Sequence, residues 1–179
     1  MRYASLLAAL AGLGLAACGG PASPDAPASA AAAPATTEPA PPAAPSGWVA
    51  ADLSTTPAKL PLVVQAPDGY TVERSPLGDV ELASEKATFD VDDVTDLGAA
   101  VLQDKQEEVK TNSGMVFEKF VLEQPDGFIA QLGGGNYLPL RLVKVGGRTY
   151  QFSVIPLNAL PSEAEARQLY DLAGQARAK

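Results

Sequence analysis

The sequence predicts an α+β domain in which two helices pack on a mainly antiparallel sheet. Short segments rich in β-branched and aromatic residues, typical of strands, recur through most of the chain after residue 47. Gly-containing turns join several of these segments directly, and two further segments have the apolar spacing of helices. Direct turns between strands favour antiparallel pairing, and we therefore expect the helices to cover a face of the sheet.

Strands are expected wherever β-branched and aromatic residues gather or alternate with polar ones. These segments are residues 60–66, 70–74, 80–83, 87–91, 115–123, 128–132, 137–145 and 148–155. Pro-Asp-Gly occurs at 67–69 and again at 125–127, where Pro presets one dihedral angle and Gly accepts a positive φ. Both are expected to be turns, but they do not mark an internal repeat because their flanking residues differ.

Gly146-Gly147 predicts a β-hairpin whose register is ambiguous. A two-residue loop pairs Val143 with Tyr150. A three-residue loop instead brings together two apolar sets, Leu138, Leu140 and Leu142 with Tyr150, Phe152 and Val154. A slip of one residue exchanges the buried face of a strand. We expect the longer loop because it unites the apolar sets.

The first helix is expected over residues 96–110, with Thr95 or Asp96 as its N-cap. Leu97, Val101 and Val109 share one side of it. The second helix has a clear start, because Ser162 is followed three positions later by Glu165, as in a capping box. Apolar residues then recur at helical spacing: Ala166, Leu169, Ala173 and Ala176. Arg177 and Lys179 follow, and their positive charges suit the negative end of a helix dipole.

Residues 1–17 predict a signal peptide. Arg2 precedes an uncharged, mostly apolar run over residues 3–17, and this run is shorter than the roughly 20 residues that a transmembrane helix needs. The end of the run, Leu15-Ala16-Ala17-Cys18, resembles the lipobox of bacterial lipoproteins, in which an aliphatic residue and two small ones precede a Cys. All four positions match. The alternatives are an ordinary cleaved signal that happens to carry a Cys, or an uncleaved N-terminal helix.

The lipobox resemblance implies that Cys18 is lipidated. Its thiol takes a diacylglycerol, the signal is cut between Ala17 and Cys18, and the new amino group is usually acylated. Each buried methylene contributes about 0.8 kcal/mol, so two or three chains anchor a protein stably. In enterobacterial lipoproteins Asp after the Cys retains the protein in the inner membrane, whereas this chain has Gly19. The expected location is the bacterial cell envelope, at the outer membrane and facing the periplasm.

Residues 18–46 are expected to form the lipidated Cys and a disordered tether. Positions 19–46 hold 11 Ala and 8 Pro among 28 residues, with no aromatic or branched apolar side chain. Such a segment cannot offset its ordering entropy by burial. At about 3.1 Å per residue it would reach on the order of 85 Å when fully extended. Residues 47–179 then form a single α+β domain.

Composition excludes several classes of protein. The net charge of −8 and a pI near 4.5 disfavour nucleic acid, which needs a basic surface. There is no His, and the one Cys is assigned to lipid, so Ser/His and Cys/His catalysis is impossible and a multi-thiolate zinc site cannot form. No phosphate-loop or Gly-x-Ser-x-Gly motif occurs. We expect no cofactor and no enzymatic activity.

Two groups of charged residues are weak candidates for sites. Asp90, Asp92, Asp93 and Asp96 could supply oxygen ligands to a cation, although an EF-hand pattern fails at its Gly and Glu positions; the alternative is a strand end leading into a helix start. Residues 128–160 hold no acids and three bases, Arg141, Lys144 and Arg148. These bases could bind an acidic partner or lipid headgroups, or could neutralise acidic neighbours inside the fold.

The function predicted from these observations is that of an envelope lipoprotein acting as a non-catalytic binding or assembly accessory. Its expected partners are the membrane, through the lipid on Cys18, and an envelope protein or ligand of unknown identity. One alternative is an enzyme that uses paired carboxylates. Another is a small-ligand carrier with a pocket between the sheet and the helices. The order of elements vaguely resembles the PsbP/Mog1-like fold, but no residue motif supports that likeness.

Overall fold

A computed structural model describes residues 46–56, 59–75, 79–98, 100–112, 114 and 116–179. All of them belong to one of the chain's two compact units. The predicted signal peptide, the lipobox and nearly all of the tether lie outside the described residues.

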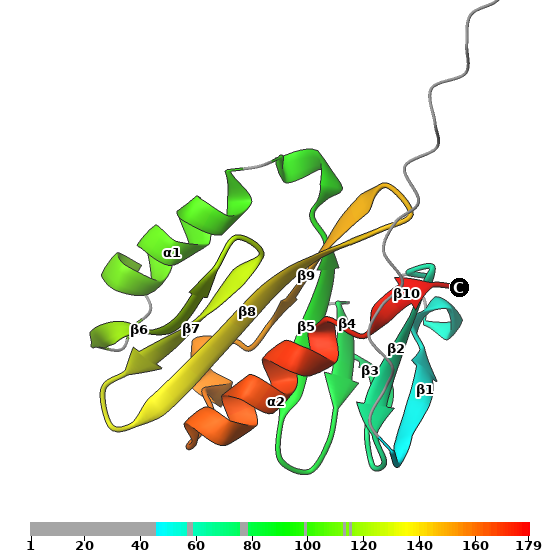
Figure 1. Cartoon of the computed structure of the whole chain (residues 1–179), viewed down its shortest axis with the longest axis horizontal. Coiled ribbons are helices and arrows are strands. Elements are labelled where there is room, and N and C mark those ends of the chain that lie inside the picture. Colours follow the sequence, from blue (N-terminus) through cyan, green and yellow to red (C-terminus); the bar gives the residue numbers. More distant parts are fainter. Residues whose placement is uncertain (1–45, 57–58, 76–78, 99, 113, 115) are drawn as a thin grey trace, which may run out of the picture. The chain divides into compact units, whose positions relative to one another are not determined.

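The main sheet has seven strands in the order β3-β4-β5-β9-β8-β7-β6 (Figure 1). Every neighbouring pair is antiparallel, which confirms the predicted fold class. The strands are β3 (Thr71–Arg74), β4 (Val80–Ala83), β5 (Thr88–Asp93), β6 (Phe117–Gln124), β7 (Gly127–Leu132), β8 (Asn136–Val145) and β9 (Arg148–Ser153). Each of them falls on a segment that the sequence predicts as a strand.

A second, three-stranded sheet has the order β1-β2-β10, and the sequence predicted only its central strand. It comprises β1 (Trp48–Asp52), β2 (Leu62–Pro67) and β10 (Ala176–Ala178). The expectation that Ala176 belongs to the last helix was wrong, because Ala176 pairs with Val64 of β2. Lys179 is likewise not at a helix end, and its Nζ lies 2.7 Å from Asp52 Oδ2. Pairing with β2 therefore overrides the helical spacing.

Both predicted helices are present, with different bounds. Helix α1 spans Val101–Asn112, and Thr95–Leu97 forms a separate short 3-10 helix before it. The expected start at residue 95 or 96 was wrong because Gly98 has a φ of 74°, which interrupts helical geometry. Helix α2 spans Glu163–Ala173, and the predicted cap is confirmed: the Glu165 N–H donates to Ser162 Oγ at 3.2 Å. Two more 3-10 helices are Leu53–Thr55 and Pro156–Asn158.

Neither helix among the described residues is long and apolar enough to cross a membrane.

The β8–β9 hairpin has the two-residue loop, so the predicted three-residue loop was wrong. Val143 pairs with Tyr150, and Val145 pairs with Arg148. Gly146 and Gly147 have φ values of 57° and 80°, the positive values that a tight primed turn requires. The expectation placed the two apolar sets of the hairpin on the same face of the sheet. The structure buries apolar side chains on both faces, so the two apolar sets need not lie together.

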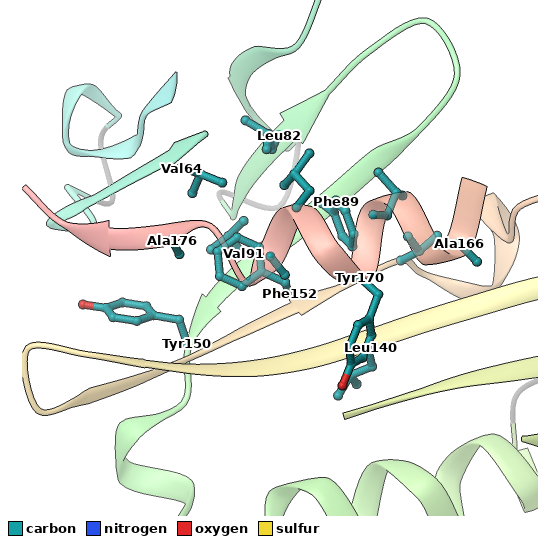
Figure 2. Close-up of a cluster of buried hydrophobic side chains, with 14 of the residues drawn as sticks. Val64, Leu82, Phe89, Val91, Leu140, Tyr150, Phe152, Ala166, Tyr170 and Ala176 are labelled. Carbon is teal, nitrogen blue, oxygen red and sulfur yellow. The ribbon is translucent and has the colours of Figure 1, made fainter. Parts of the chain in front are cut away.

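Helix α2 and the smaller sheet cover one face of the main sheet (Figure 2). Phe89, Val91, Tyr150 and Phe152 lie on that face and are almost fully buried. Helix α1 covers part of the opposite face, where it contacts β6 and β7 (Figure 1). The Lys110 ammonium lies 5.1 Å from the ring centroid of Phe120 there. The part of this face formed by β4, β5 and β9 lies beyond those contacts.

The hairpin register can be tested at its turn. Replacement of Gly147 by Val should lower the free energy of unfolding by about 1–2 kcal/mol, because a β-branched residue is strained at positive φ. Replacement of Gly146 by Asn should change it by less than about 0.5 kcal/mol, because Asn accepts the left-handed region and precedes Gly in favoured hairpin turns. Urea denaturation of both variants measures the difference. Equal effects would contradict the assigned turn.

Candidate functional site

A cleft of about 560 Å³ lies between α1 and the part of the sheet formed by β4, β5, β8 and β9. The register places the polar side chains of these strands on one face. Asp90 pairs with Glu81 and with Ser153, and Asp92 pairs with Gln151. Cross-strand partners point to the same side of a sheet, so these side chains converge. Asp90 and Asp92 are two positions apart on β5, whereas the side chains beside them belong to β4 and β9.

Two aspartates in the cleft have perturbed acidity. Burial, together with the charges of Glu81, Asp92 and Asp79, raises the pKa of Asp90 from 3.8 to about 6. Burial and the charge of Asp79 also raise the pKa of Asp92, while Lys105 opposes that shift. Perturbed acids in a concave site are typical of functional positions. Ionisation of Asp90 and Asp92 is therefore less favourable in the folded protein than in the unfolded chain.

Gln151 is the most buried polar residue of the cleft, with 6% of its surface exposed. Its Nε2 donates to Ser153 Oγ at 3.1 Å. Its Oε1 is buried and has no hydrogen-bond partner within the described part of the chain. A buried acceptor without a donor costs roughly 1–3 kcal/mol. Gln151 therefore places a buried, unsatisfied hydrogen-bond acceptor at the wall of the cleft.

Helix α1 and the ends of β8 and β9 complete the walls. Lys105 and Glu108 of α1 line the cleft and form an ion pair of 2.8 Å. Apart from Ser75, the remaining lining is apolar: Val109, Leu138, Leu140, Val154, Ile155 and Pro156. The cleft thus combines a carboxylate-rich part with an apolar part, which is the usual composition of a small-molecule site.

The structure separates the four predicted cation ligands. Asp90 and Asp92 line the cleft, whereas Asp93 pairs across the strands with Tyr150 and so points to the other face. Asp93 Oδ2 lies 2.9 Å from Arg148 Nη2, and Asp96 is exposed beyond the strand. In the described ranges no three His, Cys, Asp or Glu side chains are grouped so that they could hold a metal ion.

The three predicted basic residues do not share a surface. Arg141 Nε donates to Asp126 Oδ2 at 2.9 Å, and its Nη1 donates to the Tyr170 carbonyl oxygen at 3.1 Å. Tyr170 also donates its hydroxyl to Asp126 Oδ1 at 2.8 Å. Burial and this hydrogen bond raise the pKa of Tyr170, so the hydroxyl remains protonated and donates. Arg141 therefore attaches α2 to the sheet.

The other two bases lie elsewhere on the hairpin. Arg148 is engaged by Asp93, and Lys144 is exposed and follows the opposite alternation from Arg141 along β8. Two of the three bases thus form ion pairs within the domain, Arg141 with Asp126 and the exposed Arg148 with Asp93. Sequence reasoning missed Gln151 and Glu81. Only the strand order, which places β9 beside β5 and β5 beside β4, could have identified them.

A second, smaller cavity of about 340 Å³ lies beside α2. The turn after β2, the turn after β4 and helix α2 line it, through residues that include Tyr70, Glu85 and Glu165. All buried side-chain polar atoms on its described lining have partners. It lacks the unsatisfied acceptor of the larger cleft.

Comparison with known protein families, with characterised proteins and with solved structures found no match for this chain. The cleft and the N-terminal sequence are therefore the features of this chain that bear on its function.

Asp90→Asn tests the electrostatics of the cleft. Because the pKa of Asp90 is about 6 in the folded state and 3.8 ordinarily, the folded state binds more protons between these pH values, and stability falls as the pH rises through them. Asn cannot ionise. The variant should therefore be more stable than the parent by about 1 kcal/mol at pH 7, allowing for solvent screening, and the gain should vanish near pH 4.

Urea denaturation at both pH values measures the effect of Asp90→Asn. Asp96→Asn is the matched control, because it removes the same charge from an exposed position outside the cleft. An equal gain in both variants would show that net charge, and not the cleft, sets the effect.

Proposed function

We propose that this protein is a lipid-anchored lipoprotein of the bacterial envelope whose folded domain is a non-catalytic binding module. The lipobox resemblance at Leu15-Ala16-Ala17-Cys18 supports the anchor, and the Ala- and Pro-rich segment that follows supports a tethered domain. Its expected position is the periplasmic side of the outer membrane. The cleft between α1 and the sheet is the binding site.

The unpartnered Gln151 Oε1 beside the two carboxylates carries this proposal. A buried acceptor without a donor does not stabilise a fold. The same is true of an aspartate such as Asp90, because burial opposes its ionisation. Such groups persist where a ligand satisfies them. The cleft volume of about 560 Å³ falls in the usual range of small-ligand sites. A small ligand therefore fits the site better than a large partner surface does.

A second candidate function is carboxylate-based hydrolysis. It is favoured by Asp90, whose pKa of about 6 would suit a general acid, next to a second carboxylate in one cleft. The cleft lining that the structure describes includes no aromatic side chain on which a sugar ring could stack. Release of nitrophenol from aryl glycosides by the parent, and not by Asp90→Asn, would favour this candidate over binding alone.

The anchor is tested at Cys18. The native protein should begin at Cys18 and carry the added mass of a diacylglycerol with a further acyl chain, as intact mass spectrometry of detergent extracts would measure. Cys18→Ser should leave the signal peptide uncleaved and the mass without lipid. A native protein that begins at Met1, or that has a free thiol, would contradict the proposed anchor.

The binding site is tested by a fragment screen of the full mature chain, followed by amide chemical shifts. Bound fragments should shift the amides of Asp92, Lys105 and Gln151. The smaller cavity around Tyr70 and Glu165 is the internal comparison. If fragments shift amides there and leave the cleft unchanged, the site has been assigned wrongly.

A further inference from the structure

We propose that the cleft binds aliphatic polyamines, which carry two or more ammonium groups on a methylene chain. This inference rests on the proposed function, since it names the ligand class of the same site. It follows from the charge of the cleft, from the missing donor at Gln151 and from the apolar part of the lining.

The charge of the cleft favours a cation. Four carboxylates line it from the strand side and the segment before β4: Asp79, Glu81, Asp90 and Asp92. Helix α1 adds Glu108 and Lys105, and these two form an ion pair with each other. Lys105 also offsets part of the charge at Asp92, so the acids of the cleft keep a net excess of negative charge. A ligand with two or more positive charges would relieve their mutual repulsion.

The excess of hydrogen-bond acceptors in the cleft favours a ligand that donates. Ionised carboxylates only accept hydrogen bonds, and the Gln151 Oε1 is an acceptor without a donor in the described residues. An ammonium group has several N–H donors and no acceptor, and so it matches this set. A bare metal ion matches it less well, because the described carboxylates do not gather in the threes that a metal site needs.

The apolar lining distinguishes a polyamine from other cations. Val109, Leu138, Leu140 and Val154 face the same cleft as the acids. Methylene segments between ammonium groups can pack against such side chains, as the stems of Lys residues do. Amino acids and zwitterionic lipid headgroups also carry an ammonium, but each brings a carboxylate or phosphate that these acids would repel. A flexible chain with only positive charges suits the whole lining.

Binding should depend on pH. Protonation of Asp90 below about pH 6 removes one of the charges that attract the ligand. The groups that face Asp90 are Glu81 on β4, Asp92 on the same strand, Asp79 before β4, and Lys105 and Glu108 on α1. Only the ion-paired Lys105 is basic, so acidification weakens the attraction overall. Spermidine affinity should fall between pH 7.5 and pH 5.

Isothermal titration of the full mature chain in nonionic detergent, with spermidine and cadaverine as probes, tests the proposal. We expect saturable binding of both, with little or no binding of ε-aminocaproate, which replaces one ammonium by a carboxylate. Asp92→Asn should weaken spermidine binding about tenfold, the loss of one charge-assisted hydrogen bond. Asp96→Asn, the same change outside the cleft, should weaken it less than about twofold.

Gln151→Met separates binding from folding. It removes the unsatisfied acceptor and also the Nε2–Ser153 hydrogen bond while keeping a similar volume, so the two effects oppose each other and the melting temperature of the ligand-free chain should change little. Spermidine binding should nevertheless weaken at least severalfold. A purely structural Gln151 would leave the affinity unchanged, and that result would overturn its assigned role in binding.

Several outcomes would overturn the proposal as a whole. These are no saturable binding of either amine, equal weakening by Asp92→Asn and Asp96→Asn, or displacement of spermidine from the cleft by equimolar Ca²⁺. If fragments of other chemistry still shift the amides of Asp92 and Gln151, the proposed binding function stands and only the polyamine inference fails. If no ligand of any class perturbs the cleft, both fail.

Discussion

The two-residue turn at Gly146-Gly147 sets the alternation of the central β8–β9 hairpin, and the rest of the domain depends on that alternation. With Val143 opposite Tyr150, the aromatic side chains of β9 face α2, and Gln151 and Ser153 face the opposite side. A shift of one residue would exchange these two sets. It would bury Gln151 in the main core and expose Phe152, so the register determines at once where the core lies and where the cleft lies.

The two faces of the sheet serve different purposes. Helix α2 is attached to its face by the Asp126–Arg141–Tyr170 cluster, in which the guanidinium also lies 4.7 Å from the centroid of the Tyr170 ring. Both carboxylate oxygens of Asp126 accept a hydrogen bond in this cluster, one from Arg141 and one from Tyr170. The α1 face differs, because the helix contacts β6 and β7 and leaves the acids of β4 and β5 in a cleft. The hydrogen-bonded Asp126–Arg141–Tyr170 cluster thus lies on the α2 face, whereas the unpartnered Gln151 Oε1 and the aspartates with raised pKa lie on the α1 face.

Much of the fold could be predicted because its signals are local. Alternating residues marked seven strands of the main sheet, and the Ser162–Glu165 pair marked the start of α2. The candidate site was harder to predict from the sequence. Asp90 and Asp92 stood out as acids and were grouped with Asp93 and Asp96, although a strand sends alternate residues to opposite faces. Gln151 carried no signal at all, because a polar residue between aromatic ones in a strand is usually solvated.

The sequence by itself determined the antiparallel class, the turns and the helix cap, since each depends on hydrogen bonds and dihedral preferences within a few residues. It is also the sole basis for the lipid anchor, which stays a prediction. Tertiary structure decided the hairpin register, the strands β1 and β10, and the convergence of Glu81, Asp90, Asp92 and Gln151. The physical reason is that burial of a strand face depends on the elements that cover it. Here those elements lie far away in the chain, and only their packing selects which face becomes core.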